Sequence, residues 1–181
     1  MYLRNSFLLS LVLFFGCGPN LSEDSLRIVN QGEIIGTESD HNTYSWKGIP
    51  FAEPPINELR WKAPRPPEPF ESRFEAKEFS EECFQPQGFI PDEEGGWTGS
   101  EDCLYLNIWS PAWSLEELEA KKVPVMMWIH GGGNIIGSAN IYYPNQMVTD
   151  HEVIVVTVNY RISNLGWFRH PALRTEGSTL E

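Results

Sequence analysis

The stretch that decides the fold is VPVMMWIHGGG, residues 123–133. Residues 123–129 form an almost unbroken apolar run, and a second such run, VIVVTV, occupies residues 153–158. Apolar runs of this kind are typical of central strands that are buried on both faces. Residues 145–150 lie between the two runs and favour a short helix in a crossover, so the strands are expected to pair in parallel. The sequence therefore predicts an α/β fold.

Upstream of this stretch the sequence predicts a smaller, mostly extended region. Four short segments favour extended backbone: residues 27–29, 33–36, 43–46 and 49–51. The first two are expected to form a β-hairpin, because Asn30, Gln31 and Gly32 separate them. Six prolines between positions 54 and 69 exclude regular structure in that stretch.

Two further segments precede the deciding stretch. Residues 103–109 alternate between apolar and polar side chains, which predicts a strand with one buried face. Residues 113–122 have a helical composition, and Ser114 is the expected N-cap of that helix.

The composition indicates a single folded, acidic domain. Of 181 residues, 41% are hydrophobic and 21% are charged, as in ordinary globular chains. The 13 Lys and Arg residues are outnumbered by 25 Asp and Glu residues, which gives a net charge of −12. Such a surface repels phosphate backbones, so we expect no nucleic-acid partner. We also expect no metal site, because the sequence contains no CxxC, no HExxH and no close pair of histidines.

The first residues predict export. Arg4 supplies a positive charge, and residues 7–15 are mostly apolar but span only about half of the ~20 residues needed to cross a bilayer. Residues 1–16 are therefore expected to be a signal peptide. The segment around Gly16 and Cys17 resembles a bacterial lipobox, which implies that Cys17 is lipidated and becomes the mature N-terminus of an envelope lipoprotein attached to the membrane. Ordinary signal cleavage is the alternative, and it would give a periplasmic or secreted protein.

Residues 17–26 are predicted to form a polar tether after the signal peptide. Beyond it, Cys83 and Cys103 form an even pair in a chain expected to reach an oxidising compartment. A disulfide between them would stabilise the fold by ~3 kcal/mol on the loop-entropy model. Two reduced, buried thiols are the alternative.

His130, Gly131, Gly132 and Gly133 follow the first apolar run, at the carboxyl end of its predicted strand. Consecutive glycines allow the backbone to turn tightly and to direct N–H groups outward. A pair of exposed N–H groups is what a tetrahedral oxyanion requires. A tight turn is the simpler interpretation, and a phosphate-binding loop is not supported because GxxxxGK[ST] and GxGxxG are both absent.

These residues give the chain a resemblance to the type-B carboxylesterase and cholinesterase family, which has the α/β-hydrolase fold. VMMWIHGGG at residues 125–133 is similar to the family's oxyanion-hole strand and loop, and EDCLYLN at residues 101–107 is similar to its second signature. Other matching segments follow the family's order and spacing: residues 44–55, 59–61, 155–161 and 166–168. The resemblance covers residues 27–175. It implies that residues 27–181 are an incomplete carboxylesterase domain, with a small N-terminal β-hairpin region followed by the first strands of the central sheet.

The resemblance also implies roles for residues around the glycine run. Gly132 and Gly133 would donate N–H groups to the oxyanion. Gly131 and Asn134 would line the substrate pocket, and Asn134 replaces the family's usual aromatic residue. His130 is expected to orient the loop as a structural residue.

Other implied roles concern the surrounding structure. Cys83 and Cys103 match the family's first disulfide, whose loop helps to wall the active site. Arg60 and Glu101 match a buried ion pair, and Arg161 matches an arginine in a structural ion pair. Trp97 lies in the disulfide loop and is expected to be an ordinary packing residue rather than a ligand-stacking one.

The family's catalytic serine lies in GxSxG, and no GxSxG occurs up to Glu181. The sequence therefore predicts an N-terminal fragment of an exported serine esterase that acts on small-molecule esters without a cofactor. This fragment would supply the oxyanion hole, but alone it is expected to be inactive and to fold poorly. Two alternatives stay open: a non-catalytic esterase-like binding or adhesion module, and an inactive truncated remnant. The intact glycine run argues against the binding module.

Overall fold

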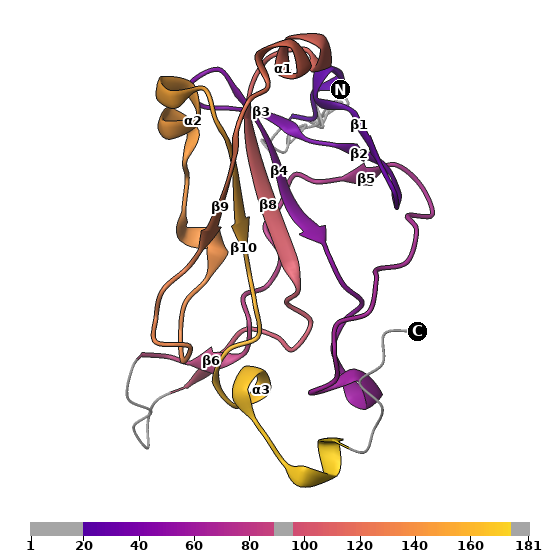
Figure 1. Cartoon of the computed structure of the whole chain (residues 1–181), viewed down its shortest axis with the longest axis vertical. Coiled ribbons are helices and arrows are strands. Elements are labelled where there is room, and N and C mark those ends of the chain that lie inside the picture. The colour runs from indigo at the N-terminus through magenta and orange to yellow at the C-terminus, as the bar shows by residue number, and fades with distance from the viewer. Residues whose placement is uncertain (1–19, 89–95, 175–181) are drawn as a thin grey trace, which may run out of the picture.

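A mixed five-stranded sheet forms the centre of the computed structural model, which describes residues 20–88 and 96–174 (Figure 1). The expected signal peptide, residues 1–16, and Cys17 lie outside the described residues. In order across the sheet, the strands are β3 (Thr37–Ser39), β4 (Thr43–Pro50), β8 (Tyr105–Pro111), β10 (Ile154–Val158) and β9 (Val125–Ile129). The first four strands pair antiparallel, whereas β9 and β10 pair in parallel.

The parallel pair confirms the predicted crossover and the α/β fold. β9 leads through the helix α2 (Asn145–His151) to β10, and the register runs from Val125 opposite Ile154 to Ile129 opposite Val158. Both arrowheads point to the same lower end of the molecule in Figure 1. The loop that contains the glycine run begins at this end.

The extended N-terminal region forms a second, smaller sheet. Its strands are β1 (Arg27–Val29), β2 (Gly32–Ile35) and β5 (Phe74–Glu75). β1 and β2 form the predicted antiparallel hairpin. The proline-rich stretch contains only the 3-10 turn Asn57–Leu59, as its prolines predicted. A further short pair, β6 (Gln85–Pro86) with β7 (Trp97–Thr98), lies inside the interval between the two cysteines.

The helices are short, and within residues 20–88 and 96–174 none is long and apolar enough to cross a bilayer. Helix α1 (Leu115–Lys121) begins where the sequence predicted, because Ser114 and Glu117 form a capping box. Helix α3 (Ser163–Trp167) follows β10. Three 3-10 turns complete the description: Glu23–Ser25, Ala139–Ile141 and Pro171–Arg174.

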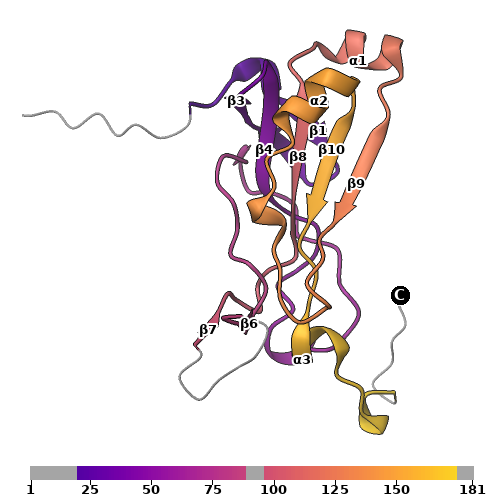
Figure 2. The same cartoon turned by 90° about the vertical axis from the view of Figure 1, so that its left-hand side faces the viewer.

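The two faces of the central sheet have separate cores. Figure 2 shows α2 lying across β8 and β10, and on this side Trp109 packs with Val148, Val153 and Val155. On the other side the small sheet covers β4, and its core contains Ile34, Tyr44, Trp46, Ile49 and Ala76.

β8 differs from its prediction, because both of its faces are covered rather than one. Asn107 and Trp109 share a face and are 1% and 0% exposed. The polar side chain of Asn107 is accommodated by hydrogen bonds: its Oδ1 accepts from the Gly48 N–H at 2.9 Å, and its Nδ2 donates to Thr157 Oγ1 at 3.1 Å. The alternation of apolar and polar residues therefore predicted the strand correctly. It was wrong about the face that carries Asn107 and Trp109, which was expected to be exposed and is buried.

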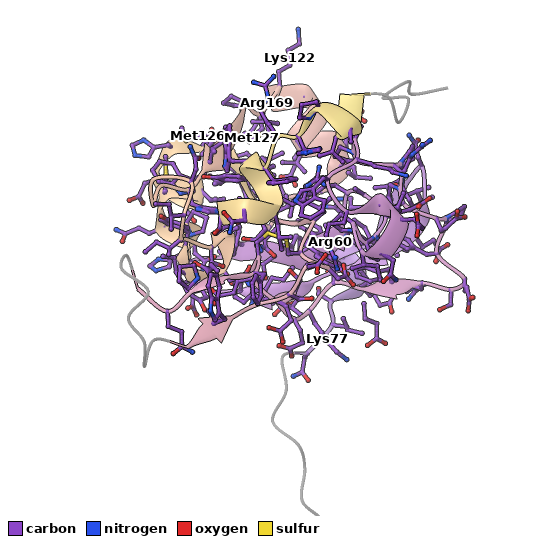
Figure 3. The ribbon with its side chains drawn as sticks, turned by 90° about the horizontal axis from the view of Figure 1, so that it is seen from below. Arg60, Lys77, Lys122, Met126, Met127 and Arg169 are labelled. Atoms are coloured by element: carbon purple, nitrogen blue, oxygen red, sulfur yellow. A yellow bond between two sulfur atoms is a disulfide. The ribbon has the colours of Figure 1, made fainter. Side chains whose placement is uncertain are left out.

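β9 also differs from its prediction. We expected this strand to be buried on both faces, but all five of its side chains are exposed, by between 41% and 65%. β9 is an edge strand of the described sheet, where β10 is its one hydrogen-bonded neighbour. Figure 3 labels Met126 and Met127 of this strand, whose side chains are 41% and 61% exposed.

Candidate functional site

The glycine run forms a tight loop directly after β9. Gly132 and Gly133 have φ values of 116° and 64°, which favour glycine. A Cβ at Gly132 would overlap the Ile136 carbonyl, whereas a Cβ at Gly133 would meet nothing within 4 Å. The Gly132 carbonyl accepts from the N–H groups of Ile135 and Ile136, at 3.1 and 3.2 Å. The loop thus closes on itself around Gly132.

The two N–H groups proposed for the oxyanion are unused in the part of the chain that the structure describes. Neither the Gly132 nor the Gly133 N–H donates to an acceptor there. Gly132 is partly exposed and Gly133 is exposed, so both N–H groups are open to solvent or to a bound acceptor. Such an acceptor would meet two donors on adjacent residues.

His130 contacts the glycine loop through its buried side chain. Its side chain is 3% exposed and stacks on the ring of Tyr160, with 4.4 Å between ring centroids. Its Nδ1 lies 2.9 Å from the Gly131 carbonyl, which can only accept, so Nδ1 carries the proton. The Tyr160 hydroxyl donates to the His130 carbonyl at 2.6 Å. These contacts hold His130 in a fixed orientation, and they leave it enclosed rather than available as a base.

An open cleft of about 590 Å³ lies beside the loop, and Gly133 and Asn134 line it. Asn134 is exposed, and its φ of 60° is one that asparagine tolerates. Asn134 is tied to α3, because its carbonyl accepts from the Ser163 N–H at 2.7 Å. Gly131, which was also expected at the pocket, is exposed but does not line this cleft, and neither does Gly132.

Two tryptophans line the same cleft. Trp97 is 49% exposed and stacks on Phe84, with ring centroids 5.1 Å apart and planes 4° apart. Trp167 of α3 is 60% exposed. Trp97 packs on the Phe84 ring but is half-exposed and lines the cleft, so its expected role as an ordinary packing residue stays a prediction.

The disulfide loop adjoins the glycine loop. Cys83 and Cys103 are bonded, with 4.9 Å between their Cα atoms, and both are almost fully buried. Gln85, two residues after Cys83, is 4% exposed and hydrogen-bonds to both backbone groups of Gly137. The sequence analysis missed Gln85, because nothing in its local sequence shows a partner 52 residues away.

Arg60 and Glu101 form the expected ion pair, but it is not buried. Arg60 donates from Nε and Nη2 to the two Glu101 oxygens, at 2.6 and 2.7 Å. The side chains are 39% and 27% exposed. The hydrogen bond and the negative charge of Glu101 raise the pKa of Arg60. This pair joins two segments that are 41 residues apart, at a partly solvated surface where an ion pair adds little to the stability of the fold.

Arg161 makes no ion pair among the described residues. Its Nη2 donates to the Lys62 carbonyl at 2.9 Å, and its Nη1 is buried without a hydrogen-bond partner there. Burial lowers its pKa. The structural ion pair implied for Arg161 therefore stays a prediction.

Within residues 20–88 and 96–174, no three His, Cys, Asp or Glu residues are grouped closely enough to hold a metal ion. What the described site offers chemically is a pair of unused backbone N–H groups next to an open cleft that Gly133 lines.

The chain matches a family model, and three of its curated relatives are named as esterases. A family model described as the carboxylesterase family matches residues 23–177. The fumonisin B1 esterase of Sphingopyxis macrogoltabida is 39% identical over 152 residues, which cover 83% of this chain and 27% of that protein. The para-nitrobenzyl esterase of Bacillus subtilis is 37% identical over 145 residues, covering 75% of this chain and 27% of that protein. The acetylcholinesterase of Danio rerio is 34% identical over 171 residues, covering 86% and 26%.

Solved structures agree with these relatives. A PNB esterase superposes with a TM-score of 0.71 at 35% identity, covering 84% of this chain and 31% of that one. A carboxylesterase of Geobacillus stearothermophilus superposes with a TM-score of 0.67 at 35% identity, covering 79% and 28%. The chain thus spans about a quarter to a third of the length of the proteins that it matches. Since sequence and fold agree over most of its residues, this chain belongs to the carboxylesterase family and forms an N-terminal portion of its α/β-hydrolase fold.

Proposed function

We propose that this chain is the N-terminal portion of an exported carboxylic-ester hydrolase and that it supplies the oxyanion hole. The observation that carries this proposal is the pair of unused N–H groups on Gly132 and Gly133, beside an open cleft. In ester hydrolysis by a serine enzyme, the serine hydroxyl adds to the ester carbonyl while a base takes its proton. The carbonyl oxygen then becomes an oxyanion, and two N–H donors stabilise it.

The donors on Gly132 and Gly133 need no reorganisation during this step. The positive φ values and the hydrogen bonds to the Gly132 carbonyl fix the loop before a substrate binds. Preorganised donors of this kind lower the barrier by ~3–4 kcal/mol each. The serine, its base and its acid would come from residues beyond this sequence, which contains no GxSxG.

The substrates that fit this proposal are small-molecule esters. Asn134 and the two cleft tryptophans would contact the acyl or alcohol group. Trp97 and Trp167 offer apolar ring faces, and the Asn134 amide adds a polar group at the position next to the donors. The mixed lining suits an ester with both apolar and hydrogen-bonding parts.

Export and lipidation of Cys17 are part of the same proposal. The Cys83–Cys103 disulfide supports an oxidising compartment. The test is mass spectrometry of the mature protein from its native host: a diacylglyceryl group on Cys17 supports the lipoprotein, and a terminus after Cys17 shows ordinary secretion. An intact Met1 would contradict export.

The decisive experiment is hydrolysis of p-nitrophenyl acetate by the longest polypeptide that carries this sequence, with residues 1–181 alone as the control. The expected result is turnover by the former and none by the latter. No turnover in a folded longer polypeptide that lacks the serine would favour the binding or adhesion module. A frame that stops after Glu181 in the native transcript would leave an inactive remnant.

A further inference from the structure

Gln85 makes an unusually complete set of hydrogen bonds between two loops. Its Oε1 accepts from the Gly137 N–H at 2.6 Å, and its Nε2 donates to the Gly137 carbonyl at 3.0 Å. Nε2 also donates to the Cys83 carbonyl at 3.1 Å. The side chain is 4% exposed, so water does not compete for these bonds. The opposite amide orientation would place Nε2 against an N–H and Oε1 against two carbonyls, so only one orientation fits.

The backbone from which the Gln85 side chain extends is held in place by a disulfide and by strand pairing. Cys83 is bonded to Cys103, and Gln85 lies in β6, where it pairs with Thr98 of β7. The Phe84 N–H donates to the Ser100 carbonyl at 2.9 Å. The amide therefore projects from a segment that is held by a covalent bond and by backbone pairing.

Gly137, the residue that Gln85 holds, closes the glycine loop. Its φ is 129°, and a Cβ there would overlap the His130 ring and the Gly131 carbonyl. Ile136, just before it, donates to the Gly132 carbonyl at 3.2 Å. Only that turn separates Gly137 from the two proposed oxyanion donors. A shift of Gly137 would therefore move His130, the Gly132 carbonyl, or both.

We propose that Gln85 is a positioning residue: it fastens the glycine loop to the disulfide loop and so holds the Gly132 and Gly133 N–H groups in place for the oxyanion. This inference rests on the proposed ester hydrolysis. It assigns to the disulfide loop a second task beside that of bordering the cleft, since the disulfide fixes the base from which Gln85 acts.

A second hydrogen bond, from the segment after Gly137 to the segment before Cys83, provides a control. Asn140 lies three residues beyond Gly137, and its side chain donates to the Ser80 carbonyl at 2.7 Å. Asn140→Ala removes this hydrogen bond and the one that Asn140 Oδ1 accepts from Asn159 Nδ2 at 3.3 Å, but it leaves the Gln85–Gly137 hydrogen bonds in place. Gln85→Leu removes all three Gln85 bonds, and Gln85→Glu keeps the shape and the acceptor but loses the donor.

The first measurement is backbone amide hydrogen exchange in the longest polypeptide that carries this chain. In the unaltered protein, the Gly137 N–H should exchange at least ~10-fold more slowly than the Gly133 N–H, which has no acceptor among the described residues. In Gln85→Leu, Gly137 should exchange about 10-fold faster, whereas Ala139, which donates to Asn159 Oδ1 at 2.7 Å, should be unchanged. Equal exchange of Gly137 and Gly133 in the unaltered protein overturns the proposal without any variant.

The second measurement is the steady-state hydrolysis of p-nitrophenyl acetate. Both Gln85 variants should lower kcat by about 10- to 100-fold with KM within about two-fold, because donors that are misplaced by about 1 Å stabilise the transition state less. Asn140→Ala should leave kcat within about two-fold of the unaltered value. Unchanged kcat in a folded Gln85→Glu, or an equal loss in Asn140→Ala, would show a merely structural role. If the unaltered polypeptide has no esterase activity, the proposed function is wrong, and the positioning role of Gln85 is wrong with it. The exchange data then show only whether the Gln85–Gly137 hydrogen bond forms.

Discussion

Gly132 and Gly133 are adjacent glycines, but the structure requires glycine at each for a different reason. At Gly132 there is no room, because a Cβ would overlap the Ile136 carbonyl. At Gly133 there is room, and only the φ of 64° disfavours other residues. A steric overlap with backbone forces the loop to move, whereas a positive φ costs ~1–2 kcal/mol and can be tolerated in place.

Alanine substitutions should therefore differ in severity. We expect Gly132→Ala to lower kcat by about 10²- to 10³-fold, as the loss of an oxyanion donor does, because the loop must rearrange. Gly133→Ala should cost about 10-fold, since the strain is small and the N–H can stay in place. Steady-state ester hydrolysis by the longest polypeptide measures both effects.

Asparagine at Gly133 provides the control, because asparagine tolerates this φ. Gly133→Asn should retain more kcat than Gly133→Val, which is branched at Cβ. The argument from φ is wrong if the two variants lose the same activity, or if Gly133→Ala proves worse than Gly132→Ala.

At the scale of elements, α1 shows how local sequence alone can place a helix. Ser114 accepts from the Glu117 N–H at 3.2 Å, and the Ser114 N–H donates to the Glu117 carboxylate at 2.9 Å. None of the α1 residues is buried, so the cap rather than a core contact defines where the helix starts. The backbone hydrogen bond from Ser114 is the main reason that the pKa of Glu117 is lowered.

The cap should make the stability of α1 depend on pH. Because the pKa of Glu117 is lower in the folded protein, its contribution is present above the ordinary pKa of 4.5 and is lost as the pH falls through the lowered value. Ser114→Ala should weaken the helix by ~1 kcal/mol at neutral pH. Amide exchange in residues 115–121 across this pH range measures the effect.

Glu116→Gln is the matched control, since Glu116 lies in the same first turn but makes no capping-box hydrogen bond. The acid-dependent loss should persist in Glu116→Gln and disappear in Glu117→Gln. A loss that persists in Glu117→Gln would assign the pH dependence to another group.

At the scale of the whole molecule, the described chain leaves apolar surfaces uncovered. The side chains of β9 form one of them, and Ile28, which is 83% exposed, borders another: a groove of about 460 Å³ that Leu115 and Leu118 also line. An exposed, uncharged edge strand is a template for pairing with another chain. The relatives and solved structures that match this chain are three to four times its matched length, so further polypeptide is available in them to cover such surfaces.

Residues 1–181 alone should therefore aggregate through β9. Met127→Lys places a charge in the middle of this edge strand and should raise the protein concentration at which turbidity appears. Gln146→Lys adds the same charge on the exposed surface of α2 and serves as the control. Static light scattering of the two variants and the unaltered chain measures the difference.

Equal solubility of Met127→Lys and Gln146→Lys would mean that net charge, rather than the β9 edge, governs the aggregation. A cooperative thermal unfolding transition of monomeric residues 1–181 would contradict the prediction altogether.

The sequence by itself determined the longer strands of the central sheet and the helices α1 and α2, and where the glycine loop lies, but not β5, β6, β7 or α3. The crossover from β9 to β10, the β1–β2 hairpin and the Ser114 cap all follow from local periodicity, turn residues and capping chemistry. The family resemblance pointed to Gly132 and Gly133 as the candidate oxyanion donors, which stays a prediction. It also implied the Cys83–Cys103 disulfide, which the structure contains in place of the two reduced thiols that were the alternative.

Only the tertiary structure decided what surrounds each element. β9 and β10 are both almost entirely apolar, yet β10 is covered and β9 is exposed, because burial depends on the neighbouring strands and helices. The buried Asn107, the orphaned Arg161 Nη1 and the Gln85–Gly137 contact were equally hidden, since each depends on a partner, or the lack of one, far along the chain. Local sequence specifies backbone conformation; which side chains are buried, and which polar groups find partners, is settled by segments that meet only when the chain folds.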